Sequence, residues 1–220
     1  DRTDSGTLIP LLKSMEQPYG SVTADAGYES LENYVYLQQH GMESYIKPTN
    51  YKSKKSNWIG RKADMQYDGQ RDCFLCRNGK ELRFCGKHTE KSGTGFEKEV
   101  SRYICTECDG CSLRRRCSKA EQQTTKTLEV CWDFEHLREQ SRANITGDKG
   151  CLYRVNRSIQ VEGTFGILKE DWGFRRFLTR GRSHILTQIG LLAFAFNILK
   201  LCAKLQTGRG KTPLLLPKPA

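Results

Sequence analysis

Short apolar runs with two different periods alternate through the first 48 residues. Helical spacing follows Asp4 in residues 7–15, and it returns in residues 30–40, where Gly41 ends the pattern. The apolar runs at Ser21–Ala24 and at residues 44–47 are short enough for strands. A strand, a helix and a second strand in this order predict a βαβ unit, in which the two strands are parallel and their carboxyl ends share one sheet edge.

Residues 49–150 are polar, show little helical periodicity and contain eight of the ten cysteines. Alternation in residues 71–76 and 81–84 flanks Asn78 and Gly79, and this dipeptide is a strong turn signal for a β-hairpin. We interpret the segment as a Cys-rich insertion of mostly β or irregular structure.

Helical periodicity returns in residues 156–172 and 183–205. Val161, Phe165, Leu168 and Trp172 fall on one stripe at 100° per residue, which predicts that this stripe packs inward. Glu162 then lies at the border between core and solvent, as does Lys169 two turns later.

The most apolar run, residues 185–205, contains interspersed polar and glycine residues and never reaches 18 uninterrupted apolar positions. We interpret it as a buried helix of the protein and not as a membrane span. The composition therefore divides the chain into residues 1–48, 49–150 and 151–205, followed by a basic, flexible tail at 206–220.

The formal charge of +11 over 220 residues favours a polyanionic partner, because neutralising phosphates with Lys or Arg releases condensed counterions. Nucleic acid is the first expectation, and an acidic membrane surface is the second.

Asp25 and Glu162 are the two candidate catalytic acids. Asp25 directly follows the first predicted strand, at the edge where ligands of open α/β sheets gather. Its plainer interpretation is that it shapes the turn Asp25-Ala26-Gly27. Glu162 has a plain alternative as well, as an ordinary exposed acid on a helix. Spacing alone does not choose between these interpretations.

The amino-acid sequence around both acids resembles that of DDE transposases, the recombinases of bacterial insertion sequences. Residues 22–30 (VTADAGYES) resemble the block around the second acid of that family. Residues 156–169 (NRSIQVEGTFGILK) resemble the block of the third acid, and residues 173–181 (GFRRFLTRG) are similar to the basic stretch that follows it. Residues 4–8 (DSGTL) and 195–200 (AFNILK) also agree, so the resemblance extends over most of the chain.

The resemblance implies a ribonuclease H-like α/β fold, interrupted by the Cys-rich insertion and incomplete at its amino end. It also implies that Asp25 and Glu162 are catalytic and hold Mg²⁺ or Mn²⁺ for DNA cleavage and strand transfer by two-metal chemistry. Related transposases carry the signature Tyr-x-x-Arg-x-x-x-Glu-x-x-x-x-x-x-Lys. Glu162 and Lys169 fit it, whereas Val155 and Ser158 occupy the Tyr and Arg places, which leaves Arg157 as a substitute for the Arg.

The same resemblance implies DNA as the partner, at insertion-sequence ends and in target DNA, and a cytoplasmic, nucleoid-associated homodimer for the full-length enzyme without membrane association. The basic residues expected to contact the DNA backbone are Lys169, Arg157, Arg175, Arg176 and Arg180. For the arginines that follow Trp172, a solvated basic loop is the alternative.

The family also requires a first Asp on an earlier strand, and no residue of this chain fits it. Asp4 lies too close to Asp25 and is better explained as a helix N-cap. We therefore expect an amino-terminally truncated transposase that is catalytically incomplete by itself.

The cysteines support a competing hypothesis, a zinc-stabilised nucleic-acid-binding module without catalytic activity. Close pairing lets thiolates converge on one tetrahedral ion. The candidate zinc ligands are Cys73, Cys76, Cys105, Cys108, Cys111 and Cys117. Reduced, small apolar cysteines are the alternative, while ferredoxin-like iron-sulfur spacing fits less well and disulfides are not expected in a reducing cytoplasm.

Overall fold

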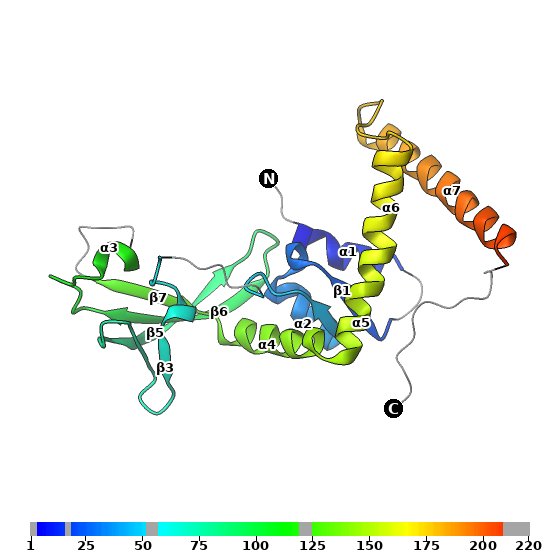
Figure 1. Ribbon diagram of the computed structural model, residues 1–220. Helices are drawn as coiled ribbons and strands as arrows, with labels where there is room; N and C mark the ends of the chain where they lie inside the picture. Colours follow the sequence, from blue (N-terminus) through cyan, green and yellow to red (C-terminus); the bar gives the residue numbers. More distant parts are fainter. Residues whose placement is uncertain (1–3, 16–18, 52–56, 119–124, 209–220) are drawn as a thin grey trace. The chain divides into compact units, whose positions relative to one another are not determined.

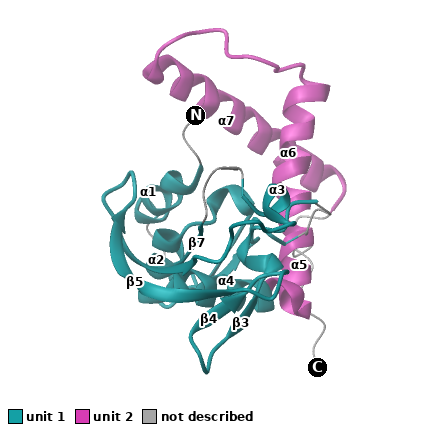
Figure 2. Ribbon diagram, turned by 90° about the vertical axis from the view of Figure 1, so that its left-hand side faces the viewer, with its two compact units in different colours: residues 1–144 teal, residues 145–220 magenta. Residues whose placement is uncertain are grey.

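The computed structural model describes residues 4–15, 19–51, 57–118 and 125–208. The chain folds into two compact units, unit 1, Asp1–Asn144, and unit 2, Ile145–Ala220, and each unit is described by itself (Figure 2). Most of the predicted tail, residues 209–220, lies outside the described residues.

The predicted βαβ unit is present in unit 1 (Figure 1). Strand β1 (Ser21–Ala24) pairs in parallel with β2 (Glu43–Ile46), and α2 (Leu31–Gln39) connects them. The Ser30 hydroxyl caps α2 by accepting a hydrogen bond from the Asn33 amide at 3.1 Å, and Gly41 follows the helix with a φ of +65°. A 3₁₀ helix at Asp4–Thr7 leads into α1 (Leu8–Lys13).

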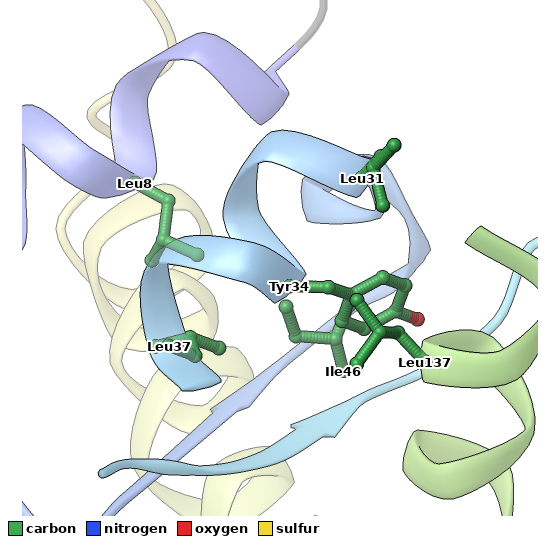
Figure 3. Close-up of a cluster of buried hydrophobic side chains, with 6 residues drawn as sticks. All are labelled: Leu8, Leu31, Tyr34, Leu37, Ile46 and Leu137. Atoms are coloured by element: carbon green, nitrogen blue, oxygen red, sulfur yellow. The ribbon is translucent and has the colours of Figure 1, made fainter. Parts of the chain in front are cut away.

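An apolar cluster holds these elements together, and it includes a helix from the last part of residues 49–150 (Figure 3). Leu37 and Ile46 are 0% exposed. Leu137 of α4 (Trp132–Thr146) packs in the same cluster. Helix α4 is therefore part of the βαβ core. Burying a leucine or isoleucine side chain completely stabilises a fold by about 1.5–3 kcal/mol.

Helix α4 also satisfies backbone groups of β2. The Ser141 hydroxyl donates to the Ile46 carbonyl at 2.8 Å, and the Asn144 amide group donates to the Ser44 carbonyl at 3.0 Å. A strand at a sheet edge exposes unpaired backbone groups that can pair with another chain, and side chains from a covering helix satisfy those groups. Among the described strands this parallel sheet has only two members, as the sequence predicted.

The insertion forms a more regular structure than the sequence predicted, a five-stranded antiparallel sheet. Its strands, in spatial order, are β3 (Gln66–Asp68), β4 (Cys73–Leu75), β5 (Glu81–Lys91), β6 (Glu97–Cys105) and β7 (Lys126–Val130). The hairpin predicted at Asn78-Gly79 joins β4 to β5, with Gly79 at a φ of +70°. The short helix α3 (Arg114–Cys117) lies between β6 and β7.

Unit 2 is helical. Helix α5 (Asp148–Arg157) continues through π-helical turns at Ser158–Glu162 and Ile167–Asp171, which flank α6 (Gly163–Gly166). Helix α7 (Arg182–Gln206) follows a loop, and Trp172 meets Phe196 of α7 edge to face with ring centroids 6.4 Å apart.

Two packing predictions are wrong in this structure. Val161, Phe165 and Trp172 are 39%, 55% and 37% exposed, because π-helical turns spread a stripe that was counted at 100° per residue and because the described part of unit 2 has no sheet to cover. Helix α7 is not a buried helix, since 6% of its most apolar window is buried. Its length and composition would allow it to cross a membrane, which is weak evidence because core helices share both properties.

Candidate active site

Asp25 lies at the carboxyl end of β1, where the βαβ pattern predicted it. One carboxylate oxygen, Oδ1, accepts a hydrogen bond from the Gly27 amide at 3.2 Å and caps the 3₁₀ turn Ala26–Tyr28. The side chain therefore shapes its turn, as the plainer interpretation held. This role and a ligand role are compatible, because a carboxylate has several acceptor positions.

Asp4 lies beside the same turn. A Cβ atom at Gly27 would come within 3.2 Å of Asp4 Oδ2 and 3.4 Å of Asp25 Oδ1. Asp4 begins the 3₁₀ helix before α1, whereas Thr7 occupies the N-cap of α1 without a side-chain hydrogen bond. The two carboxylates thus approach one glycine, a proximity that the N-cap interpretation of Asp4 did not include.

Glu29, four residues after Asp25, forms a buried ion pair with Arg138. Its side chain is 1% exposed, and its oxygens accept from Arg138 Nε at 2.8 Å and Nη2 at 3.3 Å. The Thr49 amide and the Tyr34 hydroxyl donate to the same carboxylate. Burial raises the pKa of Glu29, but the hydrogen bonds from Arg138 and Thr49 outweigh it, so the net pKa lies below 4.5. This pair fixes the segment after Asp25 to α4.

Glu162 is the last residue of the first π-helical turn, and its side chain is 67% exposed. The Ser158 hydroxyl donates to Oε2 at 2.9 Å, and Arg157 Nη1 lies 3.7 Å from Oε1. Arg157 therefore contacts the acid although it stands one residue from the family's Arg place. Ser158, which occupies that place, also contacts Glu162, and this contact was not predicted from the sequence, although residues four apart on a helix are neighbours.

The expected DNA-contacting residues all belong to unit 2. Lys169 Nζ lies over the Phe165 ring, 5.7 Å from its centroid. Arg175 is 3.6 Å from Glu170 in an exposed pair, and Arg176 and Arg180 are exposed in the loop before α7. Exposed pairs of this kind stabilise a fold weakly, so these cations remain accessible to a polyanion.

The two candidate acids belong to different units. Asp25 is placed by the βαβ core of unit 1, and Glu162 by the long helix of unit 2. Neither unit contains both carboxylates, so their assembly into one centre remains a prediction.

Five of the six candidate zinc ligands line one small cavity. They are Cys76, Cys105, Cys108, Cys111 and Cys117. The sixth, Cys73, is 2% exposed in β4 and does not line the cavity. Burial is the main cause that raises the pKa of Cys117 and the pKa of Cys108, the latter to about 12.

Basic residues of α3 hold the loops around this cavity. Arg116 Nε donates to the Asn57 carbonyl at 2.9 Å, and the Ile59 amide donates to the Arg116 carbonyl at 2.8 Å. Arg114 Nη2 donates to the Thr125 carbonyl at 3.0 Å. Arg114 and Arg116 thus have a structural role around this cavity.

A trio that sequence reasoning did not single out brings its ligand atoms within 4.8 Å of one another: His88, Glu90 and Glu129. Lys98 pairs with Glu90 at 2.9 Å, and Arg102 pairs with Glu129 at 3.0 Å. These cations already neutralise both acids, so we interpret the trio as a surface ion-pair network on the sheet.

A family profile described as the transposase DDE domain matches residues 75–202. The matched range covers more than half of the chain, so this protein belongs to the transposase DDE domain family. The range includes the cavity-lining cysteines and Glu162, and it begins after Asp25. No curated protein and no solved structure matches the chain.

Membership confirms the resemblance to DDE transposases, and it implies DNA as the partner and divalent metal as the cofactor. The mixed α/β architecture is compatible with such a domain. The donor chemistry of Asp25 and Glu162 fits a hard divalent cation, since both offer carboxylate oxygens and neither lies in an apolar cluster.

Proposed function

We propose that Asp25 and Glu162 are the second and third acids of a DDE transposase that cleaves and joins DNA at insertion-sequence ends. The observation that carries this proposal is the family match over Glu162, together with the place of Asp25 at the carboxyl end of a parallel strand. A ribonuclease H-like fold is the architecture in which such a strand end and such a helix converge.

In this proposal the two carboxylates hold Mg²⁺ or Mn²⁺, which supplies electrostatic stabilisation of the attacking and leaving oxygens during phosphodiester displacement. Gly27 has no Cβ and so leaves space next to the Asp25 carboxylate. Ser158 and Arg157 orient the Glu162 carboxylate through their contacts with it. Lys169, Arg175, Arg176 and Arg180 hold DNA phosphates as point charges or forks and so position the backbone.

We further propose that a third carboxylate, which is not identified within residues 1–220, completes the centre. Two carboxylates bind a metal pair weakly, so the 220-residue chain alone is expected not to cut DNA. The complete enzyme acts as a cytoplasmic, nucleoid-associated homodimer. In it the Cys-rich block is an insertion between the second and third acids.

The alternative is a zinc-stabilised module that only binds nucleic acid. In that module the cysteines bind zinc, and Asp25 and Glu162 have no catalytic role. The family match favours the transposase, because it spans both the cysteine block and the helix of Glu162. A zinc site within the insertion is compatible with either function.

A cleavage assay on end-sequence DNA with Mg²⁺ or Mn²⁺ tests the proposal. The 220-residue chain is compared with an enzyme extended at its amino end, and only the extended enzyme is expected to cut. Equal activity of the two would contradict the need for a third acid.

Substitutions in the extended enzyme test the two assigned acids. Asp25→Ala and Glu162→Ala should abolish cutting and leave binding to end DNA nearly unchanged. Glu170→Ala is the matched control, because Glu170 is an exposed acid eight residues further along the same helix. Full activity of Glu162→Ala would remove Glu162 from the centre.

A further inference from the structure

Five cysteines from three separate segments surround one cavity of about 20 Å³ in unit 1. Cys76 comes from the β4–β5 turn, Cys105, Cys108 and Cys111 come from the end of β6 and the loop after it, and Cys117 ends α3. A cavity of this size admits about one water molecule, which is also the scale of a single ion.

Cys105 differs from the other four. It is 1% exposed and is a buried member of the apolar cluster of Phe74, Leu82 and Tyr103, against which the partly buried Cys76 and Cys108 also pack. Cys76, Cys108, Cys111 and Cys117 are half-buried at the cavity. A buried cysteine in such a cluster behaves as a small apolar residue, so the four half-buried thiols are the ones available to a ligand.

Two turns with left-handed glycines present these thiols. The Gly79 amide donates to the Cys76 carbonyl at 2.9 Å, and Gly79 has a φ of +70°. Gly110, at a φ of +62°, precedes Cys111, whose amide lies 3.4 Å from the Cys108 carbonyl. Glycine adopts this conformation without the cost that a Cβ would impose.

Polar and charged side chains surround the cavity. Asn78 Nδ2 donates to Cys111 Sγ at 3.5 Å, which is the kind of outer-shell contact that orients a metal ligand. Glu107 and Lys80 line the cavity as an ion pair at 2.8 Å, while Arg77, Arg114 and Lys126 leave the lining with a net positive charge. Positive charge next to sulfur stabilises the deprotonated form.

We propose that Cys76, Cys108, Cys111 and Cys117 form a structural Zn²⁺ site that ties the β4–β5 turn to α3. Four thiolates satisfy the tetrahedral preference of zinc. Binding replaces four thiol protons with one Zn²⁺, releases four protons to solvent and leaves a net charge of −2, which the neighbouring cations offset. This proposal does not depend on DNA cleavage.

The set differs from what the spacing suggested, because Cys73 and Cys105 are both excluded. Tetrahedral ligation at about 2.3 Å from zinc requires sulfurs about 3.8 Å apart. Within the described residues, no three cysteine sulfurs lie within 4.8 Å of one another. Zinc binding is therefore expected to draw the two turns and α3 together, which predicts slower amide exchange in residues 76–80 and 108–117 when zinc is present.

Metal analysis of the full chain, purified without chelator and then titrated with ZnCl₂ or CoCl₂, tests the proposal. The expected result is one Zn²⁺ per chain and a Co²⁺ spectrum with thiolate charge-transfer bands. Cys76→Ser, Cys108→Ser, Cys111→Ser and Cys117→Ser should each weaken binding by at least about tenfold, because loss of even an outer-shell partner of a metal ligand weakens binding by about 10- to 100-fold. Cys85→Ser, an exposed cysteine of β5, is the matched control and should retain full binding.

A second measurement needs no variant and so remains informative if a substitution prevents folding. Alkylation followed by mass spectrometry should show the four ligand thiols protected in the zinc-loaded protein and modified after EDTA, with Cys85 modified in both. Absence of stoichiometric zinc, a disulfide among these cysteines in place of zinc, or equal alkylation with and without EDTA would overturn the proposal.

Discussion

The two units place their candidate acids by different means. In unit 1, Asp25 follows a strand whose surroundings include Leu37 and Ile46 at 0% exposure and a buried Glu29–Arg138 pair. In unit 2, Glu162 lies on a helix whose neighbouring apolar side chains, Phe165 among them, are largely exposed. Unit 1 therefore fixes its acid through a core, whereas unit 2 fixes its acid mainly through contacts along one helix.

The strongest test of this comparison is the buried ion pair. Arg138→Ala leaves the Glu29 carboxylate buried without its main partner, and breaking such a pair typically lowers the free energy of unfolding by about 3–5 kcal/mol. Denaturant unfolding of the purified chain measures the loss. Lys87→Ala removes an exposed pair with Glu99 in the same unit and should leave the midpoint nearly unchanged.

A core leucine and an exposed leucine compare the units directly. Leu37→Ala should lower the free energy of unfolding by about 2–5 kcal/mol, because it leaves a cavity in the cluster with Leu8 and Tyr34. Leu191→Ala in α7, where the side chain is 64% exposed, should change it little. Equal losses for the two variants, measured by thermal or urea unfolding, would show that unit 2 buries α7 as unit 1 buries α2.

Gly60→Ala tests the packing of residues 57–60 against α3. A Cβ at Gly60 would lie 1.8 Å from the Cys117 carbonyl oxygen, so the backbone must move. We expect a loss of about 1–3 kcal/mol in the free energy of unfolding, as for overpacked sites. Gly93→Ala in the β5–β6 loop has no atom within 4 Å of the added Cβ and serves as the control.

The smallest expected effect is the pH dependence of the Glu29–Arg138 pair. Because folding lowers the Glu29 pKa below 4.5, its stabilisation is fully present above pH 4.5 and is lost as the pH falls through the folded pKa. The difference in unfolding free energy between the wild type and Glu29→Gln should therefore shrink below pH 4.5. A difference that is constant from pH 7 to pH 3 would contradict the assigned shift.

Local signals predicted much of unit 1. Gly41 ends α2 and the Asn78-Gly79 turn forms the first hairpin, and both were predictable because each acts on its own neighbours. The pairing of Glu29 with Arg138 was not predictable, since 109 residues separate them and their meeting depends on the fold of the whole insertion.

The remaining errors arose where a fixed period does not apply. The stripe through Phe165 assumed α-helical turns, and the π-helical turns on either side of α6 change its direction. Cys73 and Cys76 look equivalent in the sequence, but only Cys76 lies at the turn and reaches the cavity. The identities of the two candidate acids came from the resemblance, because neither spacing nor charge distinguished them from ordinary surface acids.

Iron-directed protein cleavage tests most directly whether the two units share one metal centre. In the extended enzyme bound to end DNA, Fe²⁺ replaces Mg²⁺, and ascorbate with peroxide then cuts the backbone next to the bound iron. We expect cuts near both residue 25 and residue 162, both suppressed by excess Mg²⁺ and both lost in Asp25→Asn. Cuts near only one of these positions, or cuts that Asp25→Asn does not change, would contradict it.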